Sequence, residues 1–286
     1  MRILTTADFI KGKIPRREDF IPALEQFELD CVVPFLGYEV VGSFAYGSVN
    51  RDDCNIASDI DYFMIISDED HKTKVREATK RAYEGRNVYI QTRVINQEHA
   101  KSGFHTIDKP FRQHLELSVA KYGHKGENPL EILALNNVPF KDSLKNSISI
   151  YLMKLNNGFT NFPTSDEEYV GFLKDIMEKP FHAMRHAIQY IFGTVAPNGV
   201  ENFQDTKDEL IDTYKKLERF DGDLMADIDK LEKTANDYIR LLESRQKGDI
   251  PQSELKGAYS VILGRIMDCY PEAFHFIDEN AKFMKD

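Results

Sequence analysis

Two aspartates separated by one residue are the first feature of this sequence that could do chemistry. Asp59 and Asp61 open the stretch Asp59–Ile66, which is rich in strand-forming residues. Because alternate residues of a strand project to the same side, the two carboxylates are expected to share one face. Two such groups repel each other unless a cation lies between them, and hard oxygen ligands suit Mg²⁺, which completes its shell with waters and substrate phosphates. The spacing therefore predicts a magnesium site.

A glycine-serine pair upstream predicts a place for those phosphates. Gly42 lacks a Cβ, so the backbone N–H groups and the Ser43 hydroxyl of a Gly42-Ser43 turn can approach a triphosphate closely. A second pair, Gly47 and Ser48, follows and is a further candidate for nucleotide binding. The sequence thus predicts a phosphate cradle that faces the metal site.

Basic residues at helical spacing form a second candidate binding element. Lys179, His182 and His186 are spaced to share one face of a helix. Arg185 lies near that face. A cationic helix face would neutralise a triphosphate and hold the departing pyrophosphate. The alternative interpretation, a solvated basic face with packed histidines, stays open.

The elements that must position these groups divide the chain into two regions. Up to about residue 95, short β-type runs alternate with a charged helical stretch at 71–84, which is typical of a sheet with helices packed on it. After about residue 107 the pattern becomes helical. Pro180 is expected to end one helix, which starts at the N-cap Ser165, and to begin another that stops at Gly193. Further helices are expected at 206–220, 224–244 and 253–269.

The order of the motifs resembles a known superfamily. A Gly-Ser turn followed by a Ser58-Asp59-Ile60-Asp61 strand is similar to the signature of the DNA polymerase β-like nucleotidyltransferases. The segments 124–133 and 179–188 resemble a branch of it, the RNA-ligase-associated predicted nucleotidyltransferases. The resemblance implies an α+β fold, with a nucleotidyltransferase domain of mixed sheet and flanking helices at 1–125 and a helical domain at 126–286. It also implies a two-ion Mg²⁺ site and transfer of a nucleoside monophosphate from an NTP, and RNA-end modification by association only.

One part of the superfamily pattern is missing. Active members usually carry a third carboxylate on a neighbouring strand, which completes the two-metal site and can take the proton from the attacking hydroxyl. The strand expected to supply it, Val88–Ile95, contains no Asp or Glu, and Gln91 or Arg93 occupies the place. Acidic residues elsewhere that could substitute are Glu98, Glu116 and Glu131.

The net charge, the apolar runs and the cysteine spacing limit which classes of partner are expected. A formal net charge of −10 disfavours non-specific binding of duplex DNA and suits a cationic small molecule, while a local groove for an RNA end stays compatible. No apolar run is long enough for a signal peptide or a membrane span, so a cytoplasmic protein without a membrane partner is expected. The three cysteines lack zinc or redox spacing and are expected to be reduced thiols: Cys31, Cys54 and Cys269.

Three functional hypotheses follow from these features. The first is a Mg²⁺-dependent transferase that moves a nucleoside monophosphate from an NTP to an acceptor hydroxyl, with an RNA terminus as the favoured acceptor. The second is the same chemistry on a small cationic molecule or a protein. The third is a nucleotide-binding module with impaired catalysis, which the missing carboxylate suggests.

Overall fold

A computed structural model describes residues 1–51, 54–86, 88–103, 105–196, 206–217 and 222–285. The chain forms two compact units, Pro15–Phe140 and Met1–Ile14 with Lys141–Asp286. The expected domain border near residue 125 therefore lies inside the first unit, and the first 14 residues belong with the helices instead. We refer to the two parts as the sheet unit and the helical unit.

The sheet unit contains a four-stranded mixed sheet, as the sequence predicted for this region. The strand order is β3-β2-β1-β4, in which β1 runs antiparallel to β2 and β4, and β2 runs parallel to β3. Its elements are η1 (Arg17–Asp19), α2 (Phe20–Cys31), η2 (Val33–Phe35), β1 (Val40–Tyr46), β2 (Ile60–Ile66), α3 (His71–Arg86), β3 (Ile90–Asn96), α4 (Gln97–Ser102), α5 (Lys109–Tyr122), β4 (Lys125–Gly126) and α6 (Pro129–Ile132).

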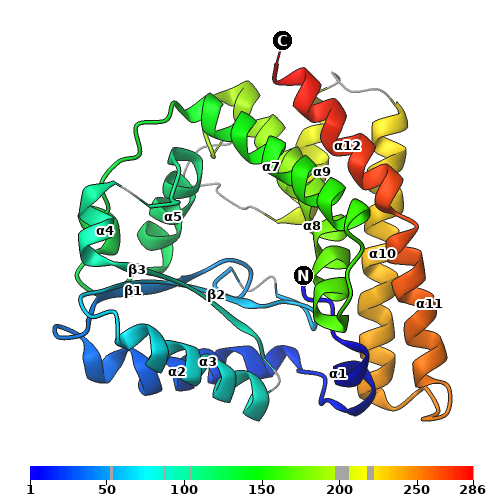
Figure 1. Cartoon of the computed structure of the whole chain (residues 1–286), viewed down its shortest axis with the longest axis horizontal. Coiled ribbons are helices and arrows are strands. Elements are labelled where there is room, and N and C mark those ends of the chain that lie inside the picture. The colour runs from blue at the N-terminus through cyan, green and yellow to red at the C-terminus, as the bar shows by residue number, and fades with distance from the viewer. Residues whose placement is uncertain (52–53, 87, 104, 197–205, 218–221, 286) are drawn as a thin grey trace. The chain divides into compact units, whose positions relative to one another are not determined.

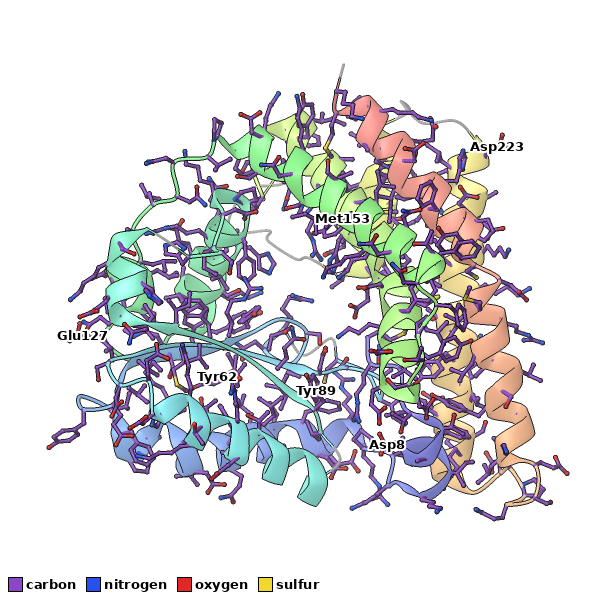
Figure 2. All side chains as sticks on the ribbon, in the orientation of Figure 1. Asp8, Tyr62, Tyr89, Glu127, Met153 and Asp223 are labelled. Carbon is purple, nitrogen blue, oxygen red and sulfur yellow. The ribbon has the colours of Figure 1, made fainter. Side chains whose placement is uncertain are left out.

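Helices cover both faces of this sheet, with α2 and α3 on one side and α4 and α5 on the other (Figure 1). Alternation along β2 builds a separate core on each side. Tyr62 and Met64 pack towards α2 and α3, whereas Phe63 and Ile65 pack towards α5. Figure 2 shows Tyr62 between the sheet and the helices of the first side. Even-numbered residues of β2 therefore project to the α2 and α3 side of the sheet, and odd-numbered residues project to the α5 side.

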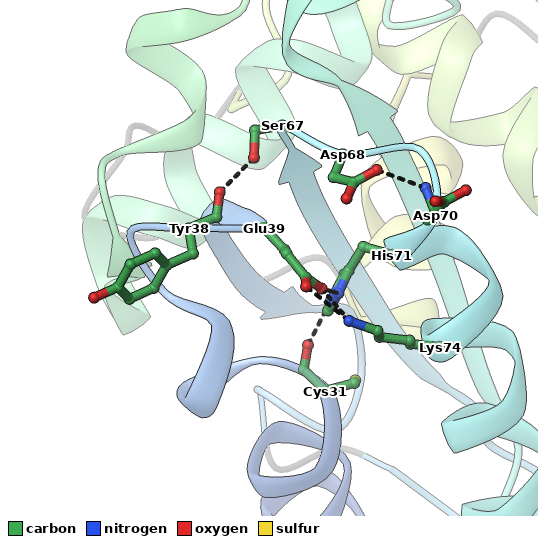
Figure 3. Close-up of polar contacts among 8 residues, drawn as sticks. All are labelled: Cys31, Tyr38, Glu39, Ser67, Asp68, Asp70, His71 and Lys74. Carbon is green, nitrogen blue, oxygen red and sulfur yellow. Dashed lines mark hydrogen bonds and ion pairs between the residues drawn. The ribbon is translucent and has the colours of Figure 1, made fainter.

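A buried histidine ties α3 to the rest of the first core (Figure 3). The His71 side chain is fully buried, and its Nδ1 and Nε2 lie 2.7 Å from Glu39 Oε2 and 2.8 Å from the Cys31 carbonyl oxygen. Lys74 donates to both oxygens of the same carboxylate, at 2.7 and 2.6 Å. Hydrogen bonds from Lys74 and His71 lower the pKa of Glu39. The first turns of α3 are thereby fixed against the start of β1.

The helical unit consists of α1 (Thr6–Lys11), α7 (Phe140–Thr160), α8 (Asp166–Phe192), α9 (Lys207–Lys216), α10 (Gly222–Lys247), α11 (Leu255–Met267) and α12 (Tyr270–Phe283). The N-terminal segment joins it through the backbone of Leu4, whose N–H donates to Tyr238 Oη at 3.0 Å and whose carbonyl accepts from Tyr259 Oη at 2.6 Å. The Phe9 ring also stacks on Tyr259 at 4.1 Å. Among the residues with a described placement, no helix is long and apolar enough to cross a bilayer.

The predicted helix break at Pro180 is wrong. Pro180 lies inside the single helix α8, which begins with a Ser165–Glu168 capping box and ends at Gly193 in the left-handed conformation, both as the sequence predicted. Apolar residues before and after the proline form one buried stripe, including Ile176 and Met184. Burial along this stripe outweighs the single hydrogen bond that proline cannot make.

Candidate active site

The aspartate pair lies at the start of a central strand. Asp59 directly precedes β2 and Asp61 is its second residue, and both side chains are half-buried. Asp61 is paired with Tyr46 at the end of β1 and with Gln91 at the start of β3. The carboxylates therefore lie at the edge of the sheet where β1 ends and β2 and β3 begin.

Asp61 projects to the side of the sheet on which Tyr46 packs, because it is an odd-numbered residue of β2. Burial raises the pKa of the Tyr46 hydroxyl, and the charges of Asp61 and Asp59 raise it further, whereas the charge of Arg93 lowers it. Tyr46 packs in the core next to α5, the side to which odd-numbered residues of β2 project. Arg93 of β3 shares this side with Asp61, whereas the common face of Asp59 and Asp61 stays a prediction.

A glycine bend lies directly against Asp61. Gly47 follows β1 and has φ +84°, and a Cβ placed on it would lie 2.6 Å from Asp61 Oδ2. The bend is closed by a hydrogen bond of 3.3 Å from the Arg51 N–H to the Gly47 carbonyl, and by Asn50 Nδ2, which donates to the Ala45 carbonyl at 2.5 Å. Only glycine allows both this backbone conformation and the close approach of the carboxylate.

The predicted Gly42-Ser43 turn is wrong, because both residues lie inside β1. The Ser43 hydroxyl is fully buried on the α2 side, 3.0 Å from Tyr62 Oη, which in turn donates to Glu28 Oε1 at 3.1 Å. A Cβ on Gly42 would collide with the carbonyl oxygen of Glu127, which directly follows β4 where that strand pairs with β1. The missing side chain of Gly42 therefore admits a neighbouring strand, and Gly47-Ser48 is the glycine-serine pair beside the aspartates.

The neighbouring strand β3 offers no third carboxylate to this face, as the sequence indicated. Gln91 lies directly opposite Asp61, and Arg93 is the next residue of β3 on the same side. The Arg93 guanidinium lies 4.6 Å from the centroid of the Phe111 ring, in a cation–π contact with α5. The place of a third acid is therefore taken by an amide and a guanidinium.

The three alternative acids are engaged or distant. Glu116 accepts a 2.8 Å hydrogen bond from Arg112 Nε, and Glu131 accepts one of 3.1 Å from Asn128 Nδ2. Glu98 lies in the first turn of α4, beyond the far end of β3. At about 3.3 Å per strand residue, Glu98 is roughly 20 Å from the start of β3. Nothing in these positions assigns any of them to the aspartate pair.

Two carboxylates on one face fit a magnesium ion that arrives with its nucleotide. Mg²⁺ is usually held by one or two carboxylates together with waters and substrate phosphates, rather than by a cage of protein ligands alone. Over the part of the chain that is described, no group of three or more His, Cys, Asp or Glu side chains could hold a metal ion. Asp59 and Asp61 thus suit an ion shared with a substrate.

The basic residues predicted to bind nucleotide lie in the helical unit, on α8. Around Tyr151 of α7, Lys179 Nζ lies 5.5 Å from the ring centroid, the His182 ring 5.9 Å and the His186 ring 5.6 Å. The three residues therefore share one face, as predicted. His186 Nε2 also lies 2.9 Å from Tyr151 Oη.

The charge of this face is smaller than the sequence suggested. Burial lowers the pKa of His182 well below its usual value, and the charges of Lys179 and Arg185 lower it further. Lys179 is also paired with an acid, because its Nζ lies 3.3 Å from Asp175 Oδ1. Packed histidines, the alternative interpretation, describe His182 and His186 better than a phosphate-facing role, while Arg185 remains a candidate for binding.

Comparison with protein-family models found no match for this chain, and comparison with curated proteins found none either.

Proposed function

We propose that this protein is a Mg²⁺-dependent nucleotidyltransferase, which moves a nucleoside monophosphate from an NTP to an acceptor hydroxyl. The observation that carries the proposal is the close approach of the Asp61 carboxylate to the Gly47 bend, with Asp59 two residues before Asp61 at the start of β2. A bend without a side chain next to paired carboxylates gives a metal-bound phosphate room to approach the backbone. The resemblance of the motif order to the DNA polymerase β-like superfamily supports the same assignment.

In the proposed reaction the acceptor oxygen forms a bond to the α-phosphorus of the NTP, and the bond to pyrophosphate breaks. Asp59 and Asp61 would hold the ion, which neutralises charge on the transferring phosphoryl group when bound. The Gly47-Ser48 bend positions the phosphates beside it. Arg93 faces the same space with a positive charge and would stabilise the departing pyrophosphate. The acceptor proton passes to solvent water, because β3 carries no carboxylate that could accept it.

An RNA terminus is the first candidate acceptor, because the segments 124–133 and 179–188 resemble the RNA-ligase-associated branch. The net charge of −10 favours a second candidate, a small cationic acceptor, since an acidic protein attracts such molecules. A protein acceptor is the third. A cytoplasmic location belongs to the same proposal.

Transfer of label from α-³²P-labelled NTPs tests the proposal with RNA, an aminoglycoside and protein offered separately as acceptors. Asp59→Asn and Asp61→Asn should each lower transfer by at least roughly a thousandfold, since a metal ligand is lost. The matched control Asp223→Asn, an exposed aspartate at the start of α10 (Figure 2), should retain full activity.

Unchanged transfer in the Asp59→Asn, Asp61→Asn double variant would refute the proposal. Tight NTP·Mg²⁺ binding without pyrophosphate release, whichever acceptor is offered, would instead identify a nucleotide-binding module.

A further inference from the structure

The strand beside the aspartates carries the wrong chemistry for a second metal ion. Gln91 is paired with Asp61, and Arg93 is paired with Phe63, so both project to the aspartate side of the sheet. The remaining residue of β3 on that side is the apolar Ile95, and Ile90–Asn96 contains no carboxylate. A second Mg²⁺ would therefore face an amide and a positive charge.

Arg93 is held in place by its neighbours. Its guanidinium lies over the Phe111 ring, 4.6 Å from the centroid, which fixes the charge on the α5 side of the sheet. The charge acts on the Tyr46 hydroxyl, on which Asp59 and Asp61 act with the opposite sign. Arg93 therefore belongs to the same electrostatic environment as the two aspartates.

Arg93 changes the charge on this face of the sheet. Taken alone, the side chains of Asp59, Asp61 and Arg93 sum to −1, and one Mg²⁺ brings that sum to +1. Three carboxylates with two Mg²⁺ ions give the same sum of +1. Two ions beside Arg93 would raise the sum for these groups to +3, without a third carboxylate to hold the second ion.

We infer that this site works with one divalent ion, and that Arg93 supplies the positive charge that a second ion supplies in a three-carboxylate site. The inference rests on the proposed function and replaces the two-ion site that the resemblance implies. Arg93 then contacts the phosphates of the bound NTP, for which a planar guanidinium with five N–H donors is well suited. Gln91 occupies the position from which a carboxylate would hold the second ion.

Electron paramagnetic resonance of Mn²⁺ tests the number of ions directly. The full-length protein is saturated with a non-hydrolysable NTP analogue and titrated with Mn²⁺. We expect one bound Mn²⁺ per chain with the spectrum of an isolated ion. Two ions about 3.5–4 Å apart, as in two-metal sites, would instead give a spectrum broadened by spin–spin coupling.

Gln91→Glu should convert the one-ion site into a two-ion site. The new carboxylate lies opposite Asp61, so a second Mn²⁺ should bind and the coupled spectrum should appear. Gln97→Glu is the matched control, because it makes the same chemical change beyond the other end of β3, about 20 Å away. The control should keep one isolated ion.

Arg93→Gln separates an electrostatic role from a structural one. Loss of the positive charge should tighten Mn²⁺ binding to the nucleotide-free protein and weaken binding of the NTP analogue, each by roughly tenfold. A purely structural role for Arg93 would weaken both.

The outcomes distinguish the inference from the proposed function. Two coupled ions in the wild type would overturn the one-ion inference and leave the transferase proposal standing. One ion in both the wild type and Gln91→Glu would overturn the assignment of position 91. No Mn²⁺ bound beyond that of the free nucleotide would overturn the proposed function itself.

Discussion

Replacing Gly47 by alanine perturbs the candidate site through its backbone bend and leaves both aspartates unchanged. The residue has φ +84°, and the left-handed region costs an L-residue about 1–2 kcal/mol. In addition, the new Cβ would lie 2.6 Å from Asp61 Oδ2, well inside an ordinary contact of about 3.5 Å. The Asp61 carboxylate must therefore move by close to 1 Å. A displacement of this size costs about a hundredfold in rate when a catalytic group must be aligned.

Gly103→Ala is the matched control for the strain alone. Gly103 caps α4 with φ +74°, but its nearest neighbour beyond the adjacent residues is the Leu135 carbonyl oxygen, 3.7 Å from the added Cβ. Both variants should lose about 1–2 kcal/mol of stability in chemical denaturation. Only Gly47→Ala should lose about a hundredfold in transfer rate, measured as pyrophosphate release. Equal activity of the two variants would show that the bend does not position Asp61 for catalysis.

Three further variants test the structural roles of Ser43, the buried His71 and Glu39. Ser43→Ala should cost about 1–2 kcal/mol of unfolding free energy, because Tyr62 Oη loses a buried partner. The affinity for NTP should stay unchanged. A loss of NTP affinity with unchanged stability would instead identify Ser43 as a phosphate ligand. His71→Ala should cost about 2–4 kcal/mol in denaturant titration, and unaltered stability would contradict its role in fixing α3. The pKa of Glu39 is lowered in the folded protein. Ionised Glu39 therefore contributes fully to the free energy of unfolding above its unfolded-state pKa, and this contribution is lost as the pH falls through its folded-state pKa. The stability difference between the wild type and Glu39→Gln should therefore shrink below about pH 4, and a difference that grows on acidification would contradict this.

Short-range patterns in the sequence predicted much of the fold. The run of strand-forming residues at 59–66 indicated the strand β2, and the Ser165 cap and Gly193 stop marked the ends of α8. Each of these signals depends only on residues close to one another in the chain. The helices α9, α10 and α11 followed from the same kind of pattern, whereas the mixed sheet was implied by the resemblance of the motif order.

Contacts between distant segments could not be predicted in this way. Gly42 and Gly47 are both glycines followed by serine, and only the pairing of β4 with β1 shows that Gly42 makes room for Glu127. The end of β1 distinguishes the two pairs, because Tyr46 is the last residue of the strand and Gly47 bends away from it. The attachment of the N-terminal segment to Tyr238 and Tyr259 spans more than 200 residues and has no local signal.

Calorimetric titration of Mn²⁺ with a non-hydrolysable NTP analogue into the wild type, Asp61→Asn and Asp223→Asn shows whether the aspartates hold a metal ion. We expect the wild type and Asp223→Asn to bind the metal–nucleotide complex alike, and Asp61→Asn to bind it at least tenfold more weakly, since a ligand of the ion is lost. Equal affinity of all three proteins would show that the aspartates at the start of β2 do not hold the ion.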